Sequence, residues 1–218
     1  MNLFALSQGE KNKRLKFKCV HRHNGLSHPN CYDQFHGLTE RVGFFDLETS
    51  NLKANWGIII SYCILGDDGV LYKRLITQEE IFSGEFDKKI CQQFCKDVRN
   101  FDRVIGWYSE RFDAPYVRTR CMFHKLDFPV FKEVNHTDAW KVCRRIMKLH
   151  SNRLGVVAPF LGIEAKGHPL NPSVWLRCLS GNQEALDFVM THNIEDVESL
   201  KKVWHRMEDY TKLTRTSI

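Results

Sequence analysis

Two carboxylates at the end of a short apolar run are the first residues whose spacing suggests chemistry. Asp46 and Glu48 follow the β-forming residues Val42, Phe44 and Phe45. Because they are two residues apart, both carboxylates point to the same face of an extended strand. Such carboxylates repel each other and are costly to desolvate, whereas a hard divalent cation such as Mg²⁺ binds oxygen ligands and offsets both effects. The stretch predicts a cation site at the end of a core strand, with a solvated turn as the alternative interpretation.

Two later segments carry carboxylates that can join such a site. Asp113 lies just before Pro115 at the expected start of a helix, where it can cap the helix or bind a cation. His192 and Asp196 are four residues apart in a long helical segment, so their side chains share one face. A carboxylate and an imidazole placed in this way can bind a metal together and activate a water molecule, and an ordinary surface His–Asp pair is the alternative.

Residues 19–31 hold two cysteines and three histidines, a density that is uncommon without a metal. Zinc takes four such ligands in a tetrahedron, and Gly25 and Pro29 supply the turns that a compact site requires. We expect a structural zinc ion here, and a basic, histidine-rich surface loop is the alternative. Three ligands are preferred and the fourth is one of two histidines that the sequence does not distinguish: Cys19, His28, Cys31, and His23 or, alternatively, His21.

The net charge of +6 suggests a polyanionic partner. A basic arm precedes the Cys/His segment and can be solvated or can contact phosphates: Lys11, Lys13, Arg14, Lys16 and Lys18. The eight cysteines are mostly scattered, which argues for reduced thiols and against a disulfide framework. No apolar run approaches the ~20 residues that span a bilayer, and the first residues lack the shape of a signal peptide. We therefore expect a cytoplasmic protein without a membrane partner.

Apolar segments and turn signals predict the elements that position these residues. The run that ends at Asp46 and Glu48 and the next two strands form an antiparallel meander, with a hairpin signal at residues 66–69. We expect an α/β fold with a central mixed five-stranded sheet flanked by helices. Asp138 can cap a helix after the last strand or orient the site. The later strands are expected at 57–65, 70–77, 103–108 and 130–137, and helices at 86–100, 154–161 and 183–207.

We divide the chain into three parts. Residues 1–38 form the basic arm and the Cys/His segment, residues 39–210 form the main domain, and residues 211–218 form a tail.

The motifs together resemble the DnaQ-like, or DEDD, 3′–5′ exonucleases, which have the ribonuclease H-like fold. That family carries Asp-x-Glu on the first strand, an aspartate after the fourth strand and a last aspartate on the final helix. The corresponding blocks here are Phe45–Thr49, Gly106–Pro115 and His192–Val197, in the same order and contexts over roughly residues 40–205. Residues 154–162 and 181–200 look particularly like the YprB-type branch.

The resemblance implies four ligands for two Mg²⁺ or Mn²⁺ ions: Asp46, Glu48, Asp113 and Asp196. It also implies hydrolysis of phosphodiester bonds from the 3′ end of single-stranded nucleic acid, with DNA favoured over RNA. The family's general base is a tyrosine four residues before the last aspartate or a histidine five residues before it. This chain has His192 at the tyrosine spacing and Thr191 at the histidine spacing, so His192 is the expected base.

Substrate contacts are expected in and after the second block. Trp107 and Tyr108 can stack on bases, with core packing as the alternative for Trp107. Arg111 is a candidate for phosphate contact, as are Arg118 and Arg120. The family often has asparagine at the position of Tyr108, so a substrate contact there is expected to differ.

Two other functions are compatible with the same motifs. One is a structure-specific endonuclease on the same fold, which would cut a circular single strand that an exonuclease cannot start on. The other is a non-catalytic nucleic-acid-binding module, which the presence of all four acids disfavours. No polymerase or helicase segment is recognisable, so a role in replication or repair would require a separate partner. The sequence defines no oligomeric state.

Overall fold

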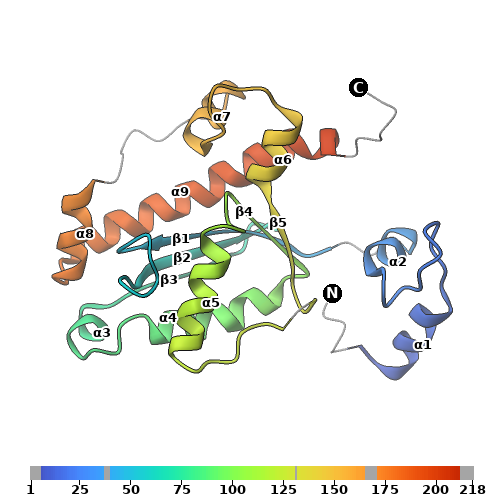
Figure 1. Ribbon diagram of the computed structural model, residues 1–218, viewed down its shortest axis with the longest axis horizontal. Coiled ribbons are helices and arrows are strands. Elements are labelled where there is room, and N and C mark those ends of the chain that lie inside the picture. The colour runs from blue at the N-terminus through green and yellow to red at the C-terminus, as the bar shows by residue number, and fades with distance from the viewer. Residues whose placement is uncertain (1–5, 37–39, 131, 165–170, 212–218) are drawn as a thin grey trace.

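A mixed five-stranded sheet forms the centre of the computed structural model, which describes residues 6–36, 40–130, 132–164 and 171–211 (Figure 1). The strand order is β3-β2-β1-β4-β5. β1 pairs antiparallel with β2, which pairs antiparallel with β3, whereas β4 runs parallel to both β1 and β5. The strands are β1 (Val42–Thr49), β2 (Ile59–Gly66), β3 (Leu71–Leu75), β4 (Arg103–Gly106) and β5 (Asn135–Asp138). This confirms the predicted mixed sheet and its antiparallel meander.

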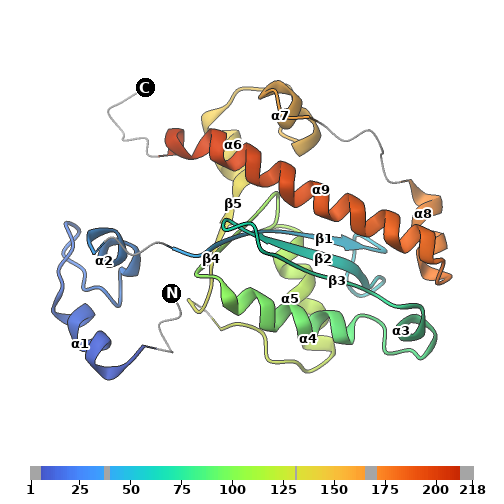
Figure 2. The same ribbon diagram turned by 180° about the vertical axis from the view of Figure 1, so that it is seen from behind.

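Helices cover both faces of the sheet. α9 runs along one face with α6 and α7 beside it, and α4 and α5 lie on the other face (Figures 1 and 2). The helices are α1 (Gln8–Lys16), α2 (Pro29–Phe35), α3 (Gln78–Phe82), α4 (Lys88–Asp97), α5 (Asp113–Phe123), α6 (Ala139–Ile146), α7 (Leu154–Phe160), α8 (Pro172–Leu179) and α9 (Gln183–Met207), with 3₁₀ turns at Val98–Asn100 and Glu208–Thr211. No helix among the described residues has both the length and the apolar character needed to cross a membrane.

The alternation of side chains along β1 decides where its carboxylates point. Phe45 and Leu47 enter the apolar cluster that includes α4 and α5, and the Phe45 ring lies 6.3 Å from that of Phe94 in α4. Phe44 enters a second cluster, formed largely by α6, α7 and α9. Because side chains alternate between the two faces, Asp46 and Glu48 lie on the face of Phe44 and therefore look toward α9.

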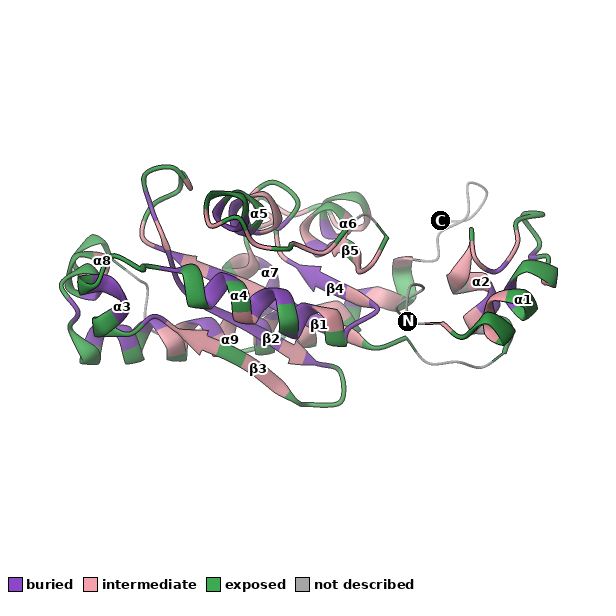
Figure 3. Cartoon of the chain, turned by 90° about the horizontal axis from the view of Figure 1, so that it is seen from below, coloured by how far each residue is buried: buried purple, intermediate pink, exposed green. Residues whose placement is uncertain are grey.

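The sheet is buried at its centre and more exposed at the β3 edge (Figure 3). Helix α9 packs a periodic row of buried side chains against the centre of the sheet. Asn182 caps the first turn of α9, because its side-chain oxygen accepts from the Ala185 N–H at 2.9 Å. The helix bounds agree with the prediction because the apolar spacing persists through all 25 residues. β5 is shorter than predicted, because it begins only at Asn135. Ahead of it, the Glu133 N–H donates to the Val130 carbonyl at 3.0 Å.

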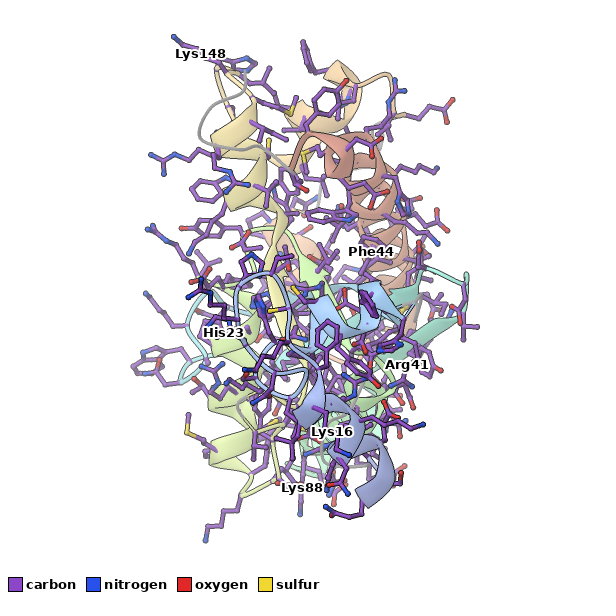
Figure 4. All side chains as sticks on the ribbon, turned by 90° about the vertical axis from the view of Figure 1, so that its right-hand side faces the viewer. Lys16, His23, Arg41, Phe44, Lys88 and Lys148 are labelled. Carbon is purple, nitrogen blue, oxygen red and sulfur yellow. The ribbon has the colours of Figure 1, made fainter. Side chains whose placement is uncertain are left out.

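A short segment that contains α1 and α2 lies beside the sheet (Figure 1). Figure 4 views the molecule from this side, with Lys16 and His23 labelled on the segment. Ser7 caps α1, and Arg14 is fully buried rather than free for phosphate contact. Its guanidinium pairs with Asp33 at 2.5 Å and with Glu10 at 3.3 Å. The expectation that Arg14 belongs to a solvated or phosphate-contacting arm is therefore wrong.

A buried ion network joins α4, α5 and β2. The Asp87 carboxylate accepts from Arg120 Nε and Nη2, each at 2.7 Å, from His124 Nε2 at 2.7 Å and from the Ile59 N–H at 2.9 Å. Burial alone raises the pKa of Asp87, but these hydrogen bonds outweigh it and lower the pKa below its ordinary value. Arg120 is thus a structural residue, which corrects its assignment as a phosphate contact.

We predict that Asp87→Ala lowers the free energy of unfolding by about 3–5 kcal/mol, because it leaves the Arg120 guanidinium buried without its partner. Urea unfolding at pH 7 measures this change. Since the folded pKa is depressed, the contribution is present above the ordinary Asp pKa of ~3.9 and is lost as the pH falls through the lowered value. Glu184→Ala is the control, because its carboxylate is 85% exposed in a surface pair with Arg177. Equal effects of the two variants would contradict the buried network.

Candidate active site

Two of the predicted ligands, Glu48 and Asp196, meet the expected base His192 where β1 passes beneath α9. The Nδ1 atom of His192 lies 3.2 Å from Glu48 Oε1 and 2.9 Å from Asp196 Oδ2. One potential ligand atom from each of these residues lies within 4.8 Å of the other two. The i,i+4 spacing on α9 and the strand alternation on β1 therefore bring together residues that are nearly 150 positions apart in sequence.

Asp113 reaches the same strand from α5. It is 4% exposed, and its Oδ1 accepts from the N–H of Leu47, the residue between Asp46 and Glu48, at 3.2 Å. Burial and, to a smaller extent, the negative charges of Glu48 and Asp138 raise the pKa of Asp113 to about 7. Asp113 is the first residue of α5 rather than its cap, so its side chain is directed to the strand.

Asp46 is tied to α9 through a residue that the sequence analysis missed. The Nδ2 group of Asn193 donates to Asp46 Oδ2 at 3.4 Å, and Asn193 is fully buried. The signal was a polar residue directly after His192 in an otherwise apolar row of α9 positions. Its buried position on the inner face of the helix makes it a positioning residue for the Asp46 carboxylate.

Asp138 fixes the turn that follows β4. Its Oδ1 accepts from the N–H groups of Tyr108 and Trp140, both at 3.0 Å, and its Oδ2 accepts from the Glu110 N–H at 3.1 Å. It therefore caps α6, as expected, and also holds the backbone between β4 and Asp113. This turn needs support because Tyr108 has a left-handed φ of 62°.

The candidate substrate contacts differ in their surroundings. Trp107 packs against the cluster of α6, α7 and α9, and its Nε1 donates to the Asn152 carbonyl at 3.0 Å, so its role is packing. Tyr108 is 40% exposed, with its ring edge-on to Trp140 at 5.1 Å. Arg111 is exposed close to Asp113 in the chain. Tyr108 and Arg111 remain available for contact with a ligand.

The donor set fits hard divalent cations. Glu48, Asp196 and Asp46 are partly exposed carboxylates, and Asp113 is a buried one whose neutral form is favoured by burial and by neighbouring negative charge. Positive charge beside Asp113 would favour its ionised form instead of its neutral form. Carboxylate oxygens are the ligands that Mg²⁺ and Mn²⁺ prefer. The structure gathers Glu48, His192 and Asp196 as direct neighbours, whereas Asp46 and Asp113 join them through Asn193 and the Leu47 N–H.

A second donor cluster lies in the N-terminal segment and could bind a metal. It contains Cys19, His21, His28 and Cys31, with one donor atom from each within 4.8 Å of the others. Of the two histidines that the sequence did not distinguish, the structure places His21 in this cluster and leaves His23 outside it. The ring of His23 instead lies edge-on against His28, with 5.1 Å between the ring centroids.

Comparisons with known proteins agree with this architecture. No curated protein matches the chain. Among solved structures, the chain is similar to the family B DNA polymerase from the hyperthermophilic archaeon Pyrobaculum calidifontis, with a TM-score of 0.64 and 16% sequence identity. The similarity covers 77% of this chain but only 24% of that polymerase. The family profile of the RNase H superfamily matches residues 43–208, from the start of β1 to the end of α9. The chain therefore belongs to the RNase H superfamily.

Proposed function

We propose that the protein is a metal-dependent 3′–5′ exonuclease of the DEDD type that hydrolyses single-stranded nucleic acid, DNA in preference to RNA. The observation that carries this proposal is the cluster of Glu48, His192 and Asp196. Beside it, Asn193 holds the Asp46 carboxylate and the Leu47 N–H holds that of Asp113. RNase H superfamily membership supports phosphodiester hydrolysis, and the resemblance of the three blocks to the DnaQ-like enzymes supports cleavage from the 3′ end.

Asp46, Glu48, Asp113 and Asp196 would hold two Mg²⁺ or Mn²⁺ ions. When bound, such ions neutralise the charge that develops on the attacking and leaving oxygens during an in-line displacement. Asn193 holds the Asp46 carboxylate by a hydrogen bond, and the Leu47 N–H holds that of Asp113, so neither carboxylate has to be ordered when substrate arrives.

His192 is the proposed general base. Its Nδ1 lies between the carboxylates of Glu48 and Asp196, which stabilise the imidazolium that forms when the ring takes a proton from the attacking water. The protonated ring can then release its proton to solvent, because the side chain is partly exposed.

Tyr108 and Arg111 are the proposed contacts to nucleic acid. An exposed aromatic ring can stack on a terminal base, and an exposed guanidinium can pair with a backbone phosphate. The similar solved structure is a DNA polymerase, and we propose that any role of this protein in replication or repair involves a partner.

We predict that Asp46→Asn and Asp196→Asn each reduce hydrolysis of a 3′-end single-stranded substrate by more than ~100-fold, a loss larger than that from removing a group that only orients a ligand. Initial rates with Mg²⁺ or Mn²⁺ on 5′-labelled oligonucleotides measure the effect. Asp187→Asn is the matched control, because Asp187 lies exposed on α9 and pairs with Gln183. Unchanged rates in Asp46→Asn, with an unchanged unfolding transition, would refute the assignment.

A substrate set distinguishes the exonuclease from its rivals. We expect shortening of a linear single strand with a free 3′ hydroxyl, no cleavage when that end is blocked, and no cleavage of a circular single strand. Cleavage of the circle would indicate an endonuclease. Tight binding in EDTA without turnover in Mn²⁺ would indicate a binding module, and parallel DNA and RNA strands test the proposed preference.

We predict that Asn193→Ala lowers kcat by about 10–100-fold and raises the Mn²⁺ concentration needed for half-maximal rate, because the Asp46 carboxylate loses its orienting donor. A metal titration of the rate separates this effect from simple destabilisation. The neighbouring Thr191→Ala serves as control, since Thr191 is exposed and its hydroxyl bonds only to the Asp187 carbonyl within α9. An Asn193→Ala variant with a normal metal requirement would show that Asn193 is a packing residue alone.

A further inference from the structure

The segment of residues 7–36 precedes the RNase H superfamily domain and has its own interior. Among its described residues, Arg14, Cys19, Gly25 and Tyr32 are buried, and none belongs to either apolar cluster of the sheet domain. Units shorter than ~40 residues rarely bury enough apolar surface to fold without a disulfide or a metal. Cys19 and Cys31 are free thiols, so a disulfide does not supply this stabilisation. The segment therefore needs another link between its two helices.

The four donors of this segment lie at the separations of a tetrahedral metal site. Cys19 Sγ is 3.4 Å from His28 Nδ1 and 3.8 Å from His21 Nδ1, and Cys31 Sγ is 3.6 Å from His21 Nδ1. With Zn–S near 2.3 Å and Zn–N near 2.0–2.1 Å, a sulfur and a nitrogen of one tetrahedron lie roughly 3.6 Å apart. The observed distances scatter around that value on both sides.

We propose that Cys19, His21, His28 and Cys31 bind one structural Zn²⁺ ion through two thiolates and two imidazole Nδ1 atoms. Two thiolates with two imidazoles favour zinc over the oxygen-seeking Mg²⁺ and Mn²⁺. Four protein ligands leave no open position, which is the pattern of a structural site rather than a catalytic one. The ion would link the loop after α1 to the first turns of α2.

The backbone between the ligands is built to present them. The Arg22 N–H donates to the Cys19 carbonyl at 2.8 Å, and Arg22 adopts a left-handed φ of 64°, so the chain reverses directly after His21. The Cys19 N–H in turn bonds the His23 carbonyl at 3.0 Å. His23 thus contributes its backbone carbonyl to the turn, and its side chain lies outside the cluster.

The next turn orders the second pair of ligands. The Asn24 side chain accepts from the Leu26 and Ser27 N–H groups at 3.0 and 2.9 Å, and the Asn24 carbonyl accepts from the His28 N–H at 2.9 Å. Pro29 then begins α2, a position that suits its fixed φ, and Cys31 follows within its first turn.

The site also connects to the buried arginine of α1. The Gly25 N–H donates to the Arg14 carbonyl at 2.7 Å, and a Cβ at Gly25 would lie 2.7 Å from the Tyr32 ring, so only glycine fits. The guanidinium of Arg14 lies 4.3 Å from the centre of the Tyr32 ring and pairs with Asp33 on α2. Arg14 therefore joins α1 to α2, and the proposed zinc joins the intervening loop to α2.

Metal analysis of the full-length protein tests the proposal directly. We expect one zinc per chain after purification without added metal, loss of that zinc in Cys31→Ser, and its retention in His23→Ala. His23→Ala is a matched control because the side chain lies against the cluster without belonging to it. Zinc absent from the parent protein, or lost equally from both variants, would overturn the assignment.

Cobalt substitution covers the case in which Cys31→Ser fails to fold. After removal of zinc, Co²⁺ added to the parent protein is expected to give the visible bands of a tetrahedral site and the near-ultraviolet band of thiolate ligation, at one equivalent. Hydrogen exchange is expected to rise in residues 7–36 on zinc removal and to stay unchanged in β1 and α9. A purely octahedral cobalt spectrum would refute the site. Both readouts are independent of nuclease activity, so either proposal can fail while the other stands.

Discussion

The structure depends on one electrostatic constraint, which is that acidic side chains are held together at the end of the central strand. The alternation of β1 commits Phe45 and Leu47 to the core, so Asp46 and Glu48 have to face α9. On the facing side, α9 places His192, Asn193 and Asp196 against these carboxylates. From α5, the Asp113 carboxylate accepts a hydrogen bond from the Leu47 N–H. Burial is the main reason that the pKa of Asp113 is raised, and the negative charges of Glu48 and Asp138 add a smaller contribution, so positive charge beside these carboxylates would be favourable. The packing of the sheet domain thus holds in place the site at which we propose that cations bind.

The carboxylates of the candidate site are oriented by hydrogen bonds from other groups of the folded chain. Asn193 orients Asp46, the backbone of β1 orients Asp113, and Asp138 orients the turn that leads to Asp113. Each contact uses a buried or partly buried polar group with a defined partner, so the geometry is set by the folded chain before any ligand binds. The buried Asp87–Arg120 pair supports the other end of α5 and keeps that helix in place against β2. Stability and site geometry therefore depend on the same elements.

Sequence patterns predicted the features that depend on local periodicity. The antiparallel meander and the bounds of α9 followed from alternation and helical spacing, because these patterns persist over whole elements. The mixed sheet followed from the resemblance to a ribonuclease H-like family. Contacts between distant residues could not be derived in this way. Asn193 is 147 positions from Asp46, and Arg120 is 33 positions from Asp87, so their partners are defined only by the tertiary fold. Likewise, the left-handed turn at Arg22 decides between His21 and His23, and no composition signal marks it.

Manganese anomalous scattering from crystals soaked at neutral pH tests the central claim most directly. The account predicts strong peaks within bonding distance of the carboxylates of Asp46, Glu48 and Asp196, with Asp113 beside them, and loss of at least one peak in Asp46→Asn. Peaks only at unrelated surface carboxylates, or an empty site at saturating Mn²⁺, would contradict it.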